Sequence, residues 1–491
     1  MSDDFPLTQG LLDLAGRQNG TVLQTHISWV VLLGDLAYKI KKPVDFGFLD
    51  FSTLPQRLHA CQEELRLNRR LAADWYLAVV PICGTPAAPQ LEGAGEPFEY
   101  AVKMRRFPPH ALLDELLGQG AVSRQMIEQL ADSLADFHHG CPAAPADGTS
   151  SAFGAYDSIV GPARQNFAQL APFDANIKLA EPLARLAQWT ENTTAKLQTT
   201  FSRRLQQGHV RECHGDLHAG NIAWIGGEPV IFDAIEFNAA FRWIDTISEI
   251  AFLVMDLYAR RQPQLARAAL NRYLEHTGDY AGVAVLDFYL VYRAMVRAKI
   301  AAFEADWQRC RDYLQLARVF IEPPPARLYI THGLSGSGKS TVSAAMVATE
   351  PRLIRIRSDV ERKRLFDLPA LASSRAAGNI YTPEATRLTY RQIMDDARLC
   401  LASGYSCIVD AAFLRRNERL RFAELARAWK TPYTIVSCQA DQATLISRLH
   451  ARQRAGNDAS EADESILHKQ IAWAEPLNAA ELAHARIIRS P

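Results

Sequence analysis

The stretch LYITHGLSGSGKSTVS, residues 328–343, decides how the last third of the chain folds. Its first residues, 328–331, are apolar, aromatic or β-branched and predict a short buried strand. Residues 333–341 follow the pattern GxxxxGK[ST], which occurs where a glycine-rich loop joins a strand to a helix. We expect the helix to begin at 341–343. This order predicts an α/β fold with a parallel sheet, in which the loop surrounds phosphate groups.

The residue types in this loop suit the binding of ATP with Mg²⁺. Glycines let backbone N–H groups turn toward the phosphates, and the start of the helix adds its positive end. Lys339 is expected to neutralise the β- and γ-phosphates, and the Ser340 hydroxyl to ligate Mg²⁺. A glycine-rich turn without a ligand is the alternative. The predicted nucleotide-binding residues are Gly333, Leu334, Ser335, Gly336, Ser337, Gly338, Lys339, Ser340 and Thr341.

Two further strand-like runs of this region end near a carboxylate. Residues 353–357 alternate in the manner of a strand and are followed by Asp359. A carboxylate at this edge of a sheet can accept the proton of a substrate hydroxyl, although it can also cap the helix expected over 360–365. Residues 406–410 form an apolar strand that ends at Asp410, which we expect to orient Mg²⁺.

A pair of arginines follows at helical spacing. Arg448 and Arg452 lie one turn apart on one face, with Arg454 close by. They are predicted to close over the γ-phosphate as a lid. A solvated basic face of a helix is the alternative.

Together these residues resemble the P-loop small-molecule kinases of the gluconate kinase, polynucleotide kinase and zeta-toxin type. The resemblance covers about residues 327–491. It implies that Asp359 engages the acceptor hydroxyl and that the lid arginines stabilise the transferred phosphate.

A second motif lies earlier in the chain. Residues 214–221, HGDLHAGN, place Asp216 and Asn221 at the H-x-D-x-x-x-x-N spacing of kinase catalytic loops. Asp216 is predicted to accept the substrate hydroxyl proton. Asn221 and Asp233, which ends an apolar run, are predicted to hold metal ions that bridge the ATP phosphates. Glu236 is a candidate ligand for a second metal or a partner of a cationic substrate. A polar loop without a catalytic role is the alternative.

This segment resembles the aminoglycoside phosphotransferase and choline kinase group, where HGDLHxGN followed by a strand ending in Asp is diagnostic. The resemblance covers about residues 20–320. It implies an α+β, protein-kinase-like fold and a small-molecule acceptor, and it assigns Asp245 a structural role. That fold accepts many hydroxyl- and amine-bearing substrates, so the acceptor is left open.

Such a fold also needs a lysine for the ATP phosphates. Residues 25–33 and 36–44 predict a hairpin across a Gly-Asp turn. Lys39 follows the A-x-K pattern and is predicted to be this lysine, with Lys41 on the same face as its rival. The helix expected over 54–71 offers Glu63 and Glu64, and we favour Glu64 as the partner. The first 40 residues contain no G-x-G-x-x-G, a departure from the protein kinase pattern.

The proline run 323–325 marks the clearest boundary, because three prolines cannot continue a helix. We predict a kinase-like domain over 1–322, with an N-lobe over 1–108 and a C-lobe over 109–322. A proline-rich linker over 323–326 and a P-loop domain over 327–491 follow. A chain of 491 residues is too long for one hydrophobic core, which agrees with this division.

Composition limits the remaining classes. The eight cysteines lack zinc or CxxC spacing, and neither a signal peptide nor a membrane span is expected, so we place the protein in the cytoplasm. From Arg327 onward, 24 Lys and Arg oppose 17 Asp and Glu. No stripe of interleaved aromatic and basic residues accompanies this excess, which argues against a nucleic acid partner.

We therefore expect a bifunctional ATP-dependent phosphotransferase that uses ATP and Mg²⁺ and acts on small-molecule hydroxyl acceptors. One alternative is an ATP-hydrolysing regulatory or switch protein whose N-terminal domain only binds. The other is a nucleic-acid end kinase.

Overall fold

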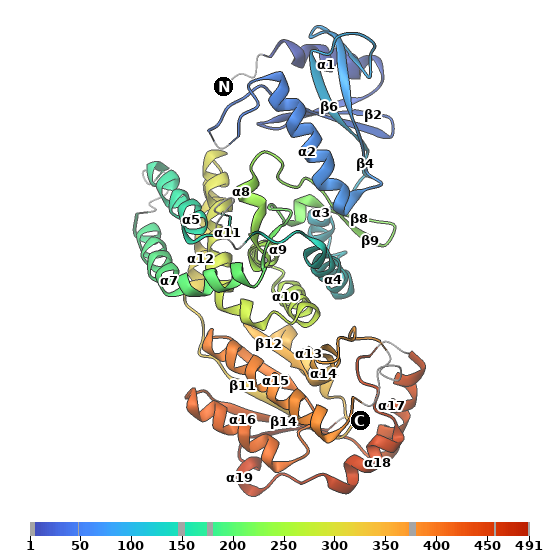
Figure 1. The fold of residues 1–491 in the computed structure, drawn as a ribbon, viewed down its shortest axis with the longest axis vertical. Helices are drawn as coiled ribbons and strands as arrows, with labels where there is room; N and C mark the ends of the chain where they lie inside the picture. Colours follow the sequence, from blue (N-terminus) through green and yellow to red (C-terminus); the bar gives the residue numbers. More distant parts are fainter. Residues whose placement is uncertain are drawn as a thin grey trace. The chain divides into compact units, whose positions relative to one another are not determined.

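The computed structural model of the chain describes residues 5–47, 49–145, 153–173, 180–372, 380–455 and 458–489. The chain divides into two compact units (Figure 1). Unit 1 comprises residues 1–162 and 201–256, and unit 2 comprises residues 163–200 and 257–491. No helix in the described part of the chain is long and apolar enough to cross a membrane.

Unit 1 begins with a six-stranded antiparallel sheet in the order β1-β2-β3-β6-β4-β5. Its core contains Trp29, Val31 and Ile40, because alternate residues of β2 and β3 face the same side. Two helices accompany the sheet, and the second of them, α2, packs against β4 and β6. The elements are α1 (Pro6–Arg17), β1 (Thr21–Gln24), β2 (Ser28–Leu33), β3 (Leu36–Lys41), α2 (Leu54–Ala72), β4 (Tyr76–Thr85), β5 (Ala88–Leu91) and β6 (Glu99–Arg105).

The rest of unit 1 is mostly helical, with two short two-stranded sheets beside the HGDLHAGN loop. Strand β7, which precedes the loop, pairs with β10, and β8, which follows the loop, pairs with β9. The elements are α3 (Leu113–Gly118), α4 (Arg124–Gly140), α5 (Tyr156–Leu170), whose residues from 163 onward fall in unit 2, β7 (Val210–Glu212), η2 (Ala219–Asn221), β8 (Ile222–Ile225), β9 (Glu228–Ile231), α8 (Ala239–Arg242), β10 (Trp243–Asp245) and α9 (Thr246–Ala259), whose residues from 257 onward fall in unit 2.

Unit 2 contains a five-stranded parallel sheet in the order β12-β13-β11-β14-β15. The residues after the carboxyl ends of β11, β12 and β13 therefore meet at one edge. The elements are β11 (Leu328–His332), α13 (Lys339–Thr349), β12 (Leu353–Arg357), α14 (Ser358–Arg364), α15 (Pro383–Ala402), β13 (Ser406–Asp410), α16 (Arg416–Ala428), β14 (Tyr433–Gln439), α17 (Gln442–Ala455), α18 (Glu464–Trp473), α19 (Ala479–Leu482) and β15 (Ala485–Arg489).

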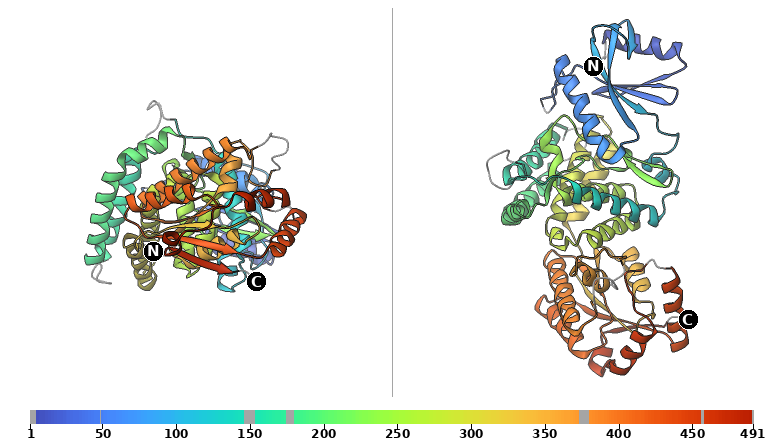
Figure 2. Two further views of the ribbon diagram at one scale, coloured as in Figure 1. Left: turned by 90° about the horizontal axis from the view of Figure 1, so that it is seen from below. Right: turned by 45° about the vertical axis from the view of Figure 1, so that its right-hand side comes forward.

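Several helices that precede the proline run also belong to unit 2. They are α7 (Ala180–Gln206), whose residues from 201 onward fall in unit 1, α10 (Pro263–Thr277), η3 (Tyr280–Gly282), α11 (Val283–Phe303) and α12 (Trp307–Ile321). Helix α10 packs against α13 and β12, and Figure 1 and the right-hand view of Figure 2 show α10 next to these elements.

The fold class predicted from the sequence is confirmed in both parts. The predicted hairpin corresponds to β2 and β3, and the strands expected near 328, 353 and 406 correspond to β11, β12 and β13. The domain boundaries at 322 and 327 stay a prediction. The two compact units are defined by contacts in space, and each of them combines separate segments of the chain.

Candidate active sites

The glycine-rich loop of unit 2 adopts a backbone that only glycine accepts easily. Gly333 has a φ of 146°, and a Cβ there would lie 2.4 Å from the carbonyl oxygen of Cys438. Gly338 caps α13 with a φ of 88°, which is in the left-handed region. The loop is therefore held close to the end of β14 and turns directly into the first turn of α13, where N–H groups remain open to an anion.

Lys339 reaches back over this loop. Its Nζ donates to the carbonyl oxygens of Gly333 at 2.9 Å and Leu334 at 2.8 Å. Burial lowers the pKa of Lys339, while the carboxylates of Asp410 and Asp359 act to raise it. The ammonium therefore lies between the loop and the two carboxylates, where the phosphates of a nucleotide would enter.

The two carboxylates come from neighbouring strands. Asp410 ends β13 and accepts a hydrogen bond from Ser343 Oγ at 2.9 Å. Asp359 lies in the first turn of α14, whose N-cap is Arg357, so the alternative reading of Asp359 as the N-cap is wrong. The helix starts two residues earlier than the sequence indicated, directly at the end of β12.

One pocket of about 650 Å³ brings these predicted residues together. The loop residues that line it are Ser335, Gly336, Gly338, Lys339, Ser340 and Thr341, and the other predicted residues are Asp359, Asp410, Arg448 and Arg452. Gly333, Leu334 and Ser337 support the loop without lining the pocket. Arg454 does not line it and is exposed.

Sequence reasoning missed several residues of this pocket. Arg357 lines it from the last position of β12, and Asp458 lies opposite. Arg362 is buried and donates from Nη1 to the oxygens of Ile380 and Thr386, at 3.0 and 3.3 Å. The position of Arg362, one helical turn after Asp359, was the available signal, because residues three apart share a helix face.

Unit 1 holds a second cluster around the HGDLHAGN loop. Asn221 Nδ2 donates to both the carbonyl oxygen and Oδ2 of Asp216, each at 3.0 Å. The backbone N–H of Phe232 donates to the carbonyl oxygen of Asn221 at 3.0 Å, which places Asp233 beside the loop. Asp233 has a φ of 65°, a strained value that occurs at functional sites. The structure therefore brings Asp216, Asn221 and Asp233 together.

The predicted lysine and its rival converge on the same carboxylate. Lys39 Nζ lies 2.9 Å from Glu64 Oε1 and also donates to Asp233. Lys41 pairs with Glu64 and with Glu236. Despite burial, which acts to raise it, the ammonium of Lys39 holds the pKa of Asp233 below its ordinary value. Lys39 thus contacts Asp233, whereas its rival Lys41 contacts Glu236.

The two other carboxylates considered from the sequence have separate partners. Glu63 pairs with Arg66 and Arg242. Asp245 forms a buried ion pair with Arg204. Both therefore contribute ion pairs away from the cluster around Asp233.

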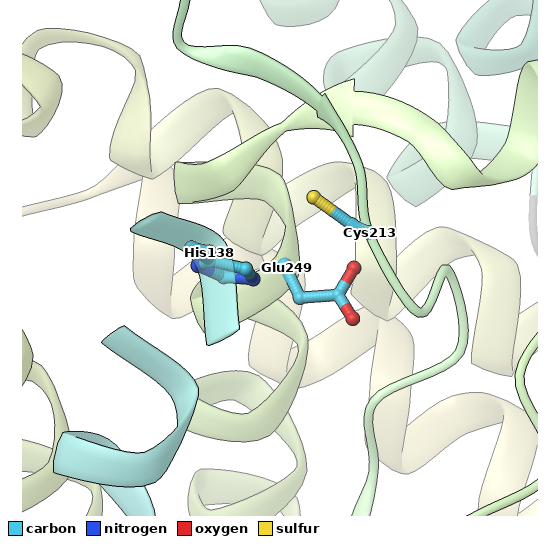
Figure 3. Close-up of side chains that lie close together, drawn as sticks. All are labelled: His138, Cys213 and Glu249. Atoms are coloured by element: carbon cyan, nitrogen blue, oxygen red, sulfur yellow. The ribbon is translucent and has the colours of Figure 1, made fainter. Parts of the chain in front are cut away.

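Glu249 supports the HGDLHAGN loop from α9, which the sequence did not indicate. Its carboxylate accepts from the backbone N–H of His214 at 3.1 Å and of Gly215 at 3.0 Å. Figure 3 shows His138 and Cys213 close to this carboxylate, and the ligand atoms of the three residues lie within 4.8 Å of one another.

A cation is nevertheless disfavoured among these three side chains. The carboxylate of Glu249 already accepts two backbone N–H groups. Burial, together with the positive charges of Arg211 and Arg70, lowers the pKa of His138 to about 3. Because the positive charges of Arg211 and Arg70 act on this site, we interpret the cluster as support for the loop rather than as a metal centre.

Family comparisons agree with this geometry. Residues 48–286 match the model described as the phosphotransferase enzyme family, and residues 328–477 match a model described as an AAA domain. The first segment contains the cluster of unit 1, and the second contains the pocket of unit 2. The matches confirm the kinase-type region and the P-loop region predicted from the sequence.

Curated relatives share both regions. Uncharacterized proteins of Mycobacterium bovis and Mycobacterium tuberculosis are 29% identical to this chain over 462 residues, which is 92% of this chain and 90% of theirs.

Among solved structures, a choline/ethanolamine kinase family protein from Mesorhizobium loti is 11% identical, with a TM-score of 0.41, over 65% of this chain and 96% of its own. The GDP complex of an aminoglycoside 2'-phosphotransferase is 14% identical, with a TM-score of 0.41, over 64% and 96%. A putative kinase from Chloroflexus aurantiacus is 22% identical, with a TM-score of 0.26, over 34% and 89%.

Proposed function

Because the chain is an ATP-dependent phosphotransferase with a phosphotransferase-family region and a P-loop region, we propose that it phosphorylates small-molecule hydroxyl acceptors at two separate sites. The observation that carries the proposal is the pocket of unit 2, where Lys339, Asp359 and Asp410 meet two arginines of α17. The cluster of Asp216, Asn221 and Asp233 supports a second site in unit 1. We place both reactions in the cytoplasm.

The side chains of the P-loop pocket have separate roles in phosphoryl transfer. Lys339 and the loop N–H groups bind the β- and γ-phosphates, and Arg448 and Arg452 stabilise charge on the transferred group. Asp359 accepts the acceptor hydroxyl proton as the hydroxyl oxygen bonds to the γ-phosphorus and ADP departs. Oxygen donors such as the Ser340 hydroxyl and the Asp410 carboxylate suit Mg²⁺, which would supply charge neutralisation there.

The residues of the cluster in unit 1 have the corresponding roles. Asp216 takes the hydroxyl proton, and Lys39, oriented by Glu64, binds ATP phosphates. Asn221 and Asp233 present amide and carboxylate oxygens that suit Mg²⁺, and Glu236 adds a third such group. Reaction depends mainly on positioning and charge neutralisation in both sites.

The test is transfer of labelled γ-phosphate from ATP into a pool of cytosolic metabolites and aminoglycosides, with wild type, Asp216→Ala and Lys339→Ala. A product lost in only one variant assigns that reaction to one site and identifies its acceptor. ATP hydrolysis that needs Lys339, labels no acceptor and persists in Asp359→Ala would instead support the switch alternative. Labelling of oligonucleotide ends would support the nucleic-acid alternative, with an affinity that falls steeply with salt.

A further inference from the structure

Helix α10 completes the edge of the parallel sheet in unit 2. Strand β12 lies at the end of that sheet, so its outer N–H and C=O groups need partners. The side-chain amide of Asn271 donates to the carbonyl oxygen of Leu353 at 3.0 Å and accepts from the N–H of Arg355 at 2.7 Å. One side chain thus bonds the strand edge as a neighbouring strand would. Since α10 lies within residues 48–286, the phosphotransferase-family region supplies this contact.

One turn further along α10, Glu275 pairs with two arginines of β12. Its carboxylate lies 2.9 Å from Arg355 Nη2 and 3.0 Å from Arg357 Nη1, and the residue is 2% exposed. Although burial acts to raise the pKa of Glu275, Arg355 and Arg357 hold it below its ordinary value. The carboxylate is therefore charged, and Arg272 of the same helix, at 3.6 Å, adds a third and longer ion pair.

Arg357 connects this carboxylate to the P-loop pocket. It lines the pocket, and its backbone lies beside that of Asp410 on the neighbouring strand β13. Its second terminal nitrogen donates to Asp458 Oδ1 at 2.8 Å. Glu275 and Asp458 thus hold the two arms of the guanidinium, and no direct ion pair joins Arg357 to Asp410 among the described residues. The negative charge of Asp410 nevertheless acts to raise the pKa of Arg357, so the two groups attract each other across the pocket.

We propose that Glu275 is a positioning residue of the P-loop site, which holds Arg357 off Asp410 so that this carboxylate stays open to Mg²⁺. The metal affinity of the second site then depends on a helix of the first family region. The inference rests on the proposed role of Lys339, Ser340 and Asp410 in binding Mg-ATP.

The test compares two variants of the full chain that each remove one carboxylate charge from a helix of unit 2. Glu275→Gln removes the charge that holds Arg357. Asp287→Asn on α11 is the matched control, because Asp287 holds Arg352 through two contacts of 2.8 Å and Arg352 does not line the pocket. Calorimetry measures ATP binding over a range of Mg²⁺ concentrations and in EDTA, with Lys339→Ala as the blank.

In Glu275→Gln, the Mg²⁺ concentration for half-maximal ATP binding is expected to rise about tenfold, as for other residues that orient metal ligands. Affinity for ATP in EDTA should stay equal or become tighter, because the site gains one net positive charge. Glu275→Asp should recover part of the Mg²⁺ affinity, and Asp287→Asn should change neither quantity. A purely structural role would weaken ATP binding with and without Mg²⁺ alike.

The inference is overturned if Glu275→Gln keeps the Mg²⁺ dependence of the wild type, or if both variants weaken binding to the same degree. Failure of the proposed function itself would be recognised by another observation. Wild-type chain that binds no ATP, or binds it equally well in Lys339→Ala, contradicts the P-loop assignment, and the inference falls with it.

Discussion

Asp396 is a buried carboxyl group whose titration should make unit 2 less stable as the pH rises. It lies on α15 and is 3% exposed. Gln392 Nε2 donates to its Oδ1 at 3.0 Å, whereas no described residue hydrogen-bonds its Oδ2. Burial, reinforced by the negative charge of Glu361, raises its pKa from the ordinary value of 3.8 to about 8. The group is therefore neutral in the folded chain at pH 7.

The sign of the effect follows from proton binding. Between pH 4 and pH 8 the unfolded chain has released this proton and the folded chain still holds it, so rising pH favours unfolding. Each pH unit costs up to about 1.4 kcal/mol, and the full interval costs about 6 kcal/mol at most. Below pH 4 both states hold the proton, and the contribution to stability is fully present.

Asp396→Asn keeps the size and the hydrogen bond from Gln392 but removes the ionisation. We expect the variant to be more stable than wild type at pH 8, by about 2 kcal/mol or more, which is several degrees in Tm. The two proteins should converge near pH 4. Differential scanning calorimetry from pH 4 to pH 8 measures the difference, and Asp395→Asn is the control because its side chain is 47% exposed. Parallel Tm profiles for wild type and Asp396→Asn would refute the reasoning.

Three further perturbations test other parts of the structure. Gly333→Ala should abolish ATP binding by unit 2, because the added Cβ meets the carbonyl oxygen of Cys438; unchanged affinity in a nucleotide titration would contradict the loop geometry. Glu64→Gln should lower turnover at the unit 1 site by about 10²-fold, since two lysines lose their shared carboxylate, while Lys339-dependent turnover stays constant. Asn271→Leu should cost about 2–5 kcal/mol by leaving two groups of β12 unbonded; hydrogen exchange of that strand should quicken, and equal protection would speak against the edge contact.

Most residues of both candidate sites could be predicted from local sequence patterns. The glycine loop and the two Asp residues that follow strands could be found from the sequence because each lies at a strand end, and parallel strands bring their ends to one edge. Spacing alone likewise paired Asp216 with Asn221, since the two positions are five apart in one loop. In each case the relevant distance along the chain is short or the sheet geometry is regular.

Tertiary packing decided the contacts of the two sites that the sequence could not predict. Lys39 and Lys41 lie on the same face of β3, and their separate partners, Asp233 for Lys39 and Glu236 for Lys41, distinguish them. Glu249 lies 35 residues after His214, the first residue of the loop that it supports, and Glu275 lies 82 residues before Arg357. Such pairs depend on which helix covers which loop or sheet edge. The free energy of that packing comes from many apolar contacts, and no short stretch of the sequence encodes it. The sequence by itself determined the two motifs and the fold class of each region, whereas the support that one region lends to the other was decided by the fold alone.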